Sequence, residues 1–88
     1  MLEGLATKDK VTGLKQTRRA VSAGRAGLVY LACDADPWLT EPLRALCAQL
    51  NVTVEEGHTM QALGRAAGIS VGTAAAALLA KEKTVFPE

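Results

Sequence analysis

The strongest constraint on the fold is an uncharged apolar run in the middle of the chain, Gly27–Cys33. A run this short that is bounded by turn signals is typical of a strand, because buried helices need more residues. Apolar side chains at successive positions, without polar alternation, indicate a strand that is covered on both faces. The sequence therefore predicts a central strand with helices packed on either side of it.

The segment before this strand predicts a helix over residues 14–23, after a short strand at residues 10–12. Gly13 separates the two elements, and Gly24 suits the left-handed position that follows a helix. The expected inner side is formed by Leu14, Thr17, Ala20 and Val21. Lys15, Gln16 and Arg19 fall on the outer face, since residues three or four apart are neighbours on a helix.

A turn and a second helix follow the central strand. Residues 34–37, Asp-Ala-Asp-Pro, predict the turn, because Asp side chains bond local amides and the residue before proline avoids helical angles. Leucines at helical spacing predict a helix over residues 39–50. We expect Thr40 to cap its first turn, Pro42 to be tolerated near its start and Asn51 to end it.

The last third of the chain predicts a strand, a helix and a strand. Residues 52–55 alternate as a short strand does, and Thr59 and Gly68 bracket a helix as its cap and its stop. The alanine run in residues 73–80 favours a helix by propensity, but the order of the elements calls for a closing strand, which we predict. Residues 81–88 are expected to form a polar tail.

These elements predict one domain over residues 1–88, with a core at about 10–80. Alternating strands and helices favour a three-layer α/β/α sandwich around a small four-stranded mixed sheet. The aromatic residues are Tyr30, Trp38 and Phe86, so alanine, leucine and valine must form the core. Such a core leaves little room for a deep small-molecule cavity, and no cofactor is expected.

Two cysteines, Cys33 and Cys47, lie in apolar segments and are too few for a disulfide framework. Free cysteines of this kind suit a reducing, cytoplasmic compartment. The first residues lack the pattern of a signal peptide, and no apolar stretch is long enough to span a membrane. We therefore expect a cytoplasmic protein without a membrane segment.

Charge is divided unevenly along a chain whose net charge is only +1. Residues 1–25 carry the basic side chains Lys8, Lys10, Lys15, Arg18, Arg19 and Arg25 against the acids Glu3 and Asp9, and the remainder is net negative. One basic face is a plausible footprint for a polyanion, although charge clusters on a first helix are more often only solvated.

Patterns that would indicate catalysis or metal binding are missing from the sequence. The sole histidine, His58, precedes the third predicted helix and is interpreted as a surface or capping residue. Asp34 and Asp36 are better explained as turn formers than as a catalytic pair. The glycines Gly64, Gly68 and Gly72 are explained by close packing or turn geometry. We predict that the chain is not an enzyme.

Three segments in a fixed order carry a family resemblance: residues 13–21 (GLKQTRRAV), 31–37 (LACDADP) and 63–71 (LGRAAGISV). Together they resemble the kink-turn-binding superfamily of archaeal and eukaryotic large-subunit ribosomal proteins, and most closely its short bacterial paralogues. The similarity covers roughly residues 10–80. It implies an α/β/α fold and a non-catalytic protein that binds kink-turn or kink-like RNA on ribosomes, mRNA or riboswitches.

The resemblance also implies an RNA site. Family members use a helix that enters the widened groove of a bent RNA and reads the guanines of tandem sheared G·A pairs. The matching residues here are Gly13, Leu14, Lys15, Gln16 and Arg19. Lys and Arg donate to guanine O6 and N7, and a helix N-terminus favours phosphate. Archaeal members usually carry Asn-Glu where this chain has Lys15-Gln16, a form that resembles the bacterial paralogues.

The loop of Ile69, Ser70 and Val71 resembles the family loop that packs against a flipped-out nucleotide, and Asp36 matches a position that contacts the bulge in some relatives. A monomer is expected.

Two other functions stay open at this point. Trp38 could anchor a protein partner on the same fold. A ribosome accessory protein could instead bind RNA through phosphates alone, with salt-sensitive, sequence-indifferent affinity.

Overall fold

The computed structural model describes residues 9–79. The elements run in the order β1 (Lys10–Thr12), α1 (Leu14–Ser22), β2 (Ala26–Ala32), α2 (Pro37–Gln49), β3 (Thr53–His58), α3 (Met60–Ala67) and β4 (Ala75–Leu79). The tail expected at residues 81–88 lies outside the described residues. No helix within 9–79 is long and apolar enough to cross a membrane.

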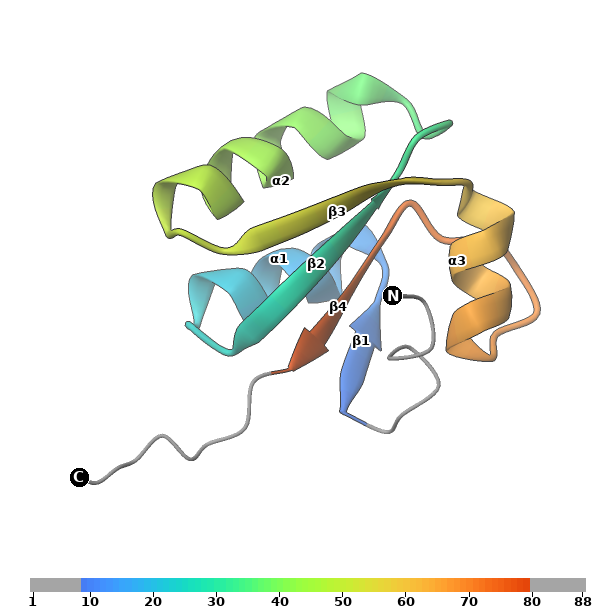
Figure 1. Cartoon of the computed structure of the whole chain (residues 1–88), viewed down its shortest axis with the longest axis horizontal. Coiled ribbons are helices and arrows are strands. Elements are labelled where there is room, and N and C mark those ends of the chain that lie inside the picture. Colours follow the sequence, from blue (N-terminus) through green and yellow to red (C-terminus); the bar gives the residue numbers. More distant parts are fainter. Residues whose placement is uncertain (1–8, 80–88) are drawn as a thin grey trace.

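The strands form one four-stranded sheet in the order β1-β4-β2-β3 (Figure 1). β2 runs parallel to β3, whereas β4 runs antiparallel to both of its neighbours, β1 and β2. The sheet is therefore mixed, as the sequence predicts. β2 and β4 are the two inner strands, so each of them pairs with a neighbouring strand on both of its edges. The predicted central strand is therefore confirmed.

Side chains of β2 alternate between two apolar layers. Val29 and Leu31 pack with residues of α1 and α2, whereas Tyr30 and Ala32 pack with residues of α3. All four are nearly or fully buried. The two helix layers cover opposite faces of the sheet, which confirms the three-layer sandwich.

The alanine run forms strand β4, although its propensity favours a helix. Ala75, Ala76 and Ala77 are completely buried. They pair with β1 on one side and β2 on the other. Ala75 and Ala77 join the core under α1 and α2, and Ala76 joins the core under α3. Tertiary pairing outweighs local propensity here, because β4 pairs with a strand on each side and buries its alanines in both apolar layers.

The start of α2 differs from the prediction. The helix begins at Pro37, and Asp36 caps it by accepting a hydrogen bond from the Trp38 amide at 3.0 Å. Thr40 is buried inside the helix, so its predicted role as cap is wrong, and Pro42 lies inside the helix as well. An Asp cap followed by proline at the first helical position starts the helix earlier than Thr40 would.

β3 extends to His58, beyond the strand predicted at residues 52–55. His58 is therefore not a cap of α3, a role that Thr59 fills. Its Nε2 lies 2.7 Å from Glu55 Oε2, and its ring lies tilted beside Tyr30. The sequence did not indicate the second half of this strand because its residues are polar. They are polar because β3 lies at the edge of the sheet and is partly exposed to solvent. Cys33 is exposed after the end of β2, contrary to the buried position expected for it, whereas Cys47 is buried.

Candidate nucleic-acid interface

All three helices begin at the same edge of the sheet. β1, β2 and β3 end at this edge, and antiparallel β4 begins there, with Thr12 opposite Ala76 and Leu31 opposite Ala75 (Figure 1). Because a helix follows each of the first three strands, the N-termini of α1, α2 and α3 gather beside the start of β4. Positive ends of helix dipoles therefore share one side of the molecule.

Gly13 makes the turn from β1 into α1. Its φ of 96° lies in a region that favours glycine. Its amide donates to the carbonyl of Ala75 at 2.8 Å and lies 3.1 Å from the Thr73 hydroxyl, while its carbonyl accepts from the Thr17 amide at 2.9 Å. The start of α1 is thus fastened to the residues that lead into β4.

The three helix N-termini differ in how their first amides are satisfied. Asp36 caps α2, and the Thr59 hydroxyl caps α3 by accepting from the Ala62 amide at 3.0 Å. Asp34 accepts from the Met60 amide at 2.8 Å, also at the start of α3. By contrast, α1 has no side-chain cap. Its first free amides are the kind of donors that bind phosphate oxygens.

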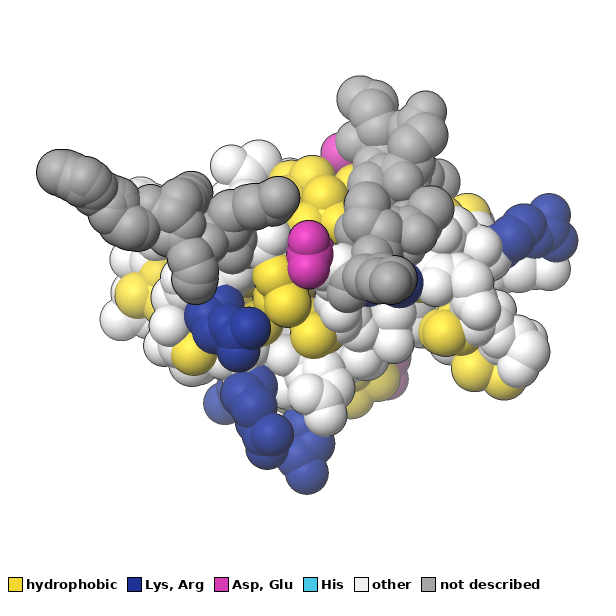
Figure 2. Space-filling model, turned by 90° about the horizontal axis from the view of Figure 1, so that it is seen from below, with side chains coloured by type: hydrophobic (Ala, Val, Ile, Leu, Met, Phe, Trp, Pro, Cys, Tyr) yellow, Lys and Arg dark blue, Asp and Glu magenta, His cyan; other side chains and the backbone are white. Residues whose placement is uncertain are grey.

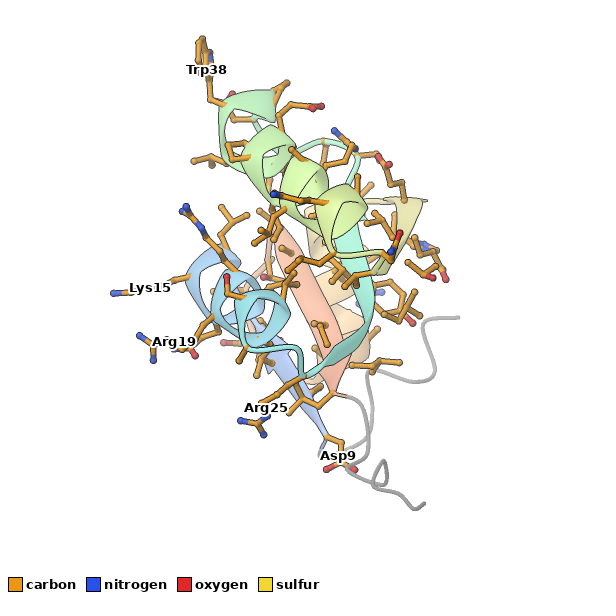
Figure 3. The ribbon with its side chains drawn as sticks, turned by 90° about the vertical axis from the view of Figure 1, so that its left-hand side faces the viewer. Asp9, Lys15, Arg19, Arg25 and Trp38 are labelled. Atoms are coloured by element: carbon orange, nitrogen blue, oxygen red, sulfur yellow. The ribbon has the colours of Figure 1, made fainter. Side chains whose placement is uncertain are left out.

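The outer face of α1 is basic. Lys15, Gln16, Arg18 and Arg19 are exposed, whereas Thr17, Ala20 and Val21 face the core. Figure 3 shows Lys15, Arg19 and Arg25 projecting to the same side of the molecule. Figure 2 shows several Lys and Arg side chains close together along the lower margin of that view, with other basic side chains elsewhere on the surface. Segment 10–33 contains no acidic residue to offset these charges.

The charges on α1 are not paired within the part of the chain that the structure describes. There, Lys15, Arg18, Arg19 and Arg25 form no ion pair. Salt bridges instead lie on the side of α2 and β3, where Arg44 bonds both Glu41 and Glu56. On β3, His58 Nε2 also lies within hydrogen-bond distance of Glu55. The α1 face is therefore available to an anionic partner.

Perturbed ionisable groups lie away from α1. Hydrogen bonds to Glu56 and Glu41 raise the pKa of Arg44, and the hydrogen bond from His58 lowers the pKa of Glu55. Burial raises the pKa of the Cys47 thiol, which keeps it protonated at neutral pH. Among residues 9–79, no three His, Cys, Asp or Glu side chains group as metal ligands would.

The loop of Ile69, Ser70 and Val71 folds back along α3. Gly68 ends the helix in the left-handed conformation. Gly64 permits the return, because a Cβ added there would overlap the carbonyl oxygen of Val71. Ser70 and Val71 are exposed and Ile69 is half-buried. The close-packing interpretation of this glycine is confirmed.

The structure places the residues of the predicted site in two groups, on opposite layers of the sheet. Gly13, Leu14, Lys15 and Gln16 belong to the start of α1, and Arg19 lies one turn further along. Ile69, Ser70 and Val71 lie beside α3, across the sheet. Thr73 connects the two groups, because it approaches Gly13 and its amide donates to the Met60 carbonyl at 3.1 Å. The Asp36 carboxylate is occupied as the cap of α2, which supports its turn-forming role.

The sequence did not indicate that Thr73 contacts Gly13 or that Asp34 accepts a hydrogen bond from the start of α3. Thr73 is buried, and its hydroxyl also donates to the Ala75 carbonyl at 2.7 Å. Only its place directly before the alanine run could have suggested that it ends a loop. Asp34 was assigned to the turn, but its bond to α3 joins residues 26 positions apart. Such a contact depends on strand order and has no local signal.

These observations define a class of protein: a small α/β/α domain with a basic helix face at one edge of its sheet. Within residues 9–79, the cations of that face form no ion pair. The sequence matches the profile of the ribosomal protein L7Ae/L30e/S12e/Gadd45 family over residues 3–85. The chain belongs to this family, and the family resemblance seen in the sequence is confirmed.

Individual relatives agree with this membership. The chain is 44% identical over 69 residues to an RNA-binding protein of Geobacillus kaustophilus, covering 78% of this chain and 84% of that protein. It is 38% identical to the large ribosomal subunit protein eL8 of Halobacterium salinarum, covering 77% of this chain and 58% of eL8. The solved structure of a Giardia lamblia 15.5kD RNA binding protein superposes with a TM-score of 0.82 at 29% identity, covering 92% of this chain and 68% of that one.

Proposed function

We propose that this protein is a non-catalytic RNA-binding protein that recognises kink-turn or kink-like RNA through the edge where its helices begin. The observation that carries the proposal is the basic face of α1, which has no ion pair within residues 9–79 and starts at a helix end without a side-chain cap. Relatives named as RNA-binding and ribosomal proteins support it.

Each part of the site has a distinct role in this proposal. The first amides of α1, after Gly13 and Leu14, bind a phosphate of the bent backbone. Lys15 and Arg19 donate to guanine O6 and N7 of the tandem G·A pairs, and Gln16 both donates and accepts. A kink widens the major groove, whereas A-form RNA keeps these base edges out of reach. The bent conformer is thereby selected from the RNA ensemble.

The loop contributes the second half of the site. Ile69 and Val71 offer apolar surface to the face of a flipped-out base, and Ser70 lies between them. Val71 is 69% exposed, although its side chain is apolar. Asp36 is assigned a lesser role, since its carboxylate already caps α2. We further propose that the protein acts as a monomer in the cytoplasm, on ribosomes, mRNA or riboswitches.

A binding titration tests this function. It compares a labelled kink-turn RNA with the same RNA in which Watson–Crick pairs replace the tandem G·A pairs, at near-physiological salt. We expect tight binding to the first RNA and a loss of at least about tenfold on the second, because base contacts contribute roughly 1–3 kcal/mol each. Equal, weak binding to both RNAs would identify a phosphate-only binder. In that case, log affinity falls by about 0.7–0.9 per phosphate contact for each log unit of salt.

A further inference from the structure

A hollow of about 330 Å³ lies between α1 and α2, and it extends the predicted site from Leu14 and Lys15 towards α2. Its walls are formed by Leu14, Lys15, Arg18, Trp38, Leu39, Pro42 and Leu43. Two of these residues are basic and none is acidic. Lys15 also belongs to the proposed guanine-reading face, so the two surfaces are continuous.

Trp38 has no structural role that explains its presence in the first turn of α2. Its side chain is 86% exposed, and Figure 3 shows it standing clear of the domain. The neighbouring Leu39 is 51% exposed. Neither residue belongs to either core cluster. An exposed indole at the start of α2 therefore lines the same hollow as Lys15 and Arg18 of α1.

We propose that Trp38 stacks on an unpaired nucleobase of the bound RNA while Arg18 holds an adjoining phosphate. The inference rests on the proposed function and extends its footprint from α1 onto α2. Indole faces stack on any base, and cationic neighbours follow the backbone, which is the combination that binds single-stranded nucleotides. On the side of Trp38 that faces α1, the hollow carries Lys15 and Arg18 and no acid, which favours a phosphate-bearing occupant there. Asp36 and Glu41 border Trp38 on its other side.

The sole tryptophan of the chain makes the contact measurable. In the first measurement, 2-aminopurine is placed in turn at each unpaired position of a kink-turn RNA. Stacking on Trp38 should quench both the indole and the 2-aminopurine emission at one position. The quench at that position should disappear in Trp38→Ala. No quench at any position would overturn the proposal.

A thermodynamic cycle gives the second measurement. Trp38→Ala should weaken binding by roughly 5- to 150-fold, the range that base–aromatic stacking provides, and Trp38→Phe should restore most of it. With an RNA that is abasic at the quenched position, Trp38→Ala should have no further effect. The proposal would be overturned if Trp38→Ala weakened binding to the abasic RNA as much as it weakens binding to the intact RNA. Leu50→Ala serves as control, since Leu50 is an exposed apolar residue at the other end of α2.

Failure here is distinguishable from failure of the proposed function. Wild-type protein that binds the kink-turn RNA but shows neither quench nor cycle coupling would refute only the Trp38 contact, and Trp38 would then be free to serve a protein partner. Wild-type protein that does not prefer the kink-turn RNA over its Watson–Crick counterpart would refute the proposed function itself.

Discussion

Charged side chains on α1 and on the α2–β3 side of the molecule have opposite surroundings. On the α2–β3 side, Arg44 bonds Glu41 and Glu56, with 3.2 Å between its Nε and Glu56 Oε2, and His58 bonds Glu55. On α1, Lys15 and Arg19 form no ion pair within the described residues. The first set is paired within the fold, whereas the second has no ion-pair partner among residues 9–79.

This difference separates stability from binding. Exposed ion pairs contribute only about 0–1 kcal/mol to stability, so even the paired side gains little from its charges. On α1 no ion pair within residues 9–79 adds to stability, and the proposed RNA is the partner for these charges. Substitutions on the two sides should therefore affect different measurements.

The largest expected effect comes from the double variant Lys15→Ala, Arg19→Ala. Binding to the kink-turn RNA should weaken by about 100-fold or more, because each base contact contributes about 1–3 kcal/mol. The free energy of unfolding should change by less than about 0.5 kcal/mol, as is usual at exposed positions. Titration and urea denaturation measure the two quantities.

Arg44→Ala is the matched control, since it also removes an exposed cation. RNA affinity should stay within about twofold of wild type, and stability should fall by no more than about 1 kcal/mol. A loss of RNA affinity equal to that of the double variant would mean that net charge, rather than the α1 face, governs binding.

Gly64→Ala tests the loop half of the site without changing charge. The added Cβ overlaps the Val71 carbonyl, so the loop must shift, at a cost of about 1–3 kcal/mol that the better helix propensity of alanine offsets in part. Both the melting temperature and the RNA affinity should fall. Unchanged RNA affinity in a destabilised variant would remove Ile69, Ser70 and Val71 from the proposed site.

Thr17→Val should have the smallest effect and the opposite sign. Thr17 is completely buried on the inner side of α1, and its hydroxyl has no hydrogen-bond partner within the described residues. Valine has nearly the same shape without the unsatisfied group, so stability should rise by about 1 kcal/mol. RNA affinity should not change. Denaturation that shows a destabilised protein would indicate that the hydroxyl has a partner.

Local signals predict much of this fold. The Thr59 cap and the Gly68 stop predict α3, and the uncharged run predicts β2, because these features act within a few residues. The predicted start of α2 was wrong because both Thr40 and Asp36 are residue types that cap helices. Only the packing of the folded chain shows that Thr40 is buried. The end of β3 was missed because Glu56 and Gly57 look like a loop when the strand lies at an edge.

The site was predictable in its parts but not in its arrangement. Exposure of Lys15, Gln16 and Arg19 follows from helical spacing alone. The bond between Gly13 and Thr73, which places the loop near the start of α1, depends on β4 lying between β1 and β2. That strand order cannot be predicted from the spacing or the composition of the sequence. The hollow between α1 and α2 arises from the same long-range packing.

The amide chemical shifts of the protein during addition of a kink-turn RNA would show which surface binds it. We expect the largest shifts at residues 13–19 and 69–73, where α1 begins and the loop returns to the sheet. Segment 41–56, which holds the paired charges, should change little. Shifts centred on segment 41–56, with the start of α1 unaffected, would show that RNA does not bind through α1.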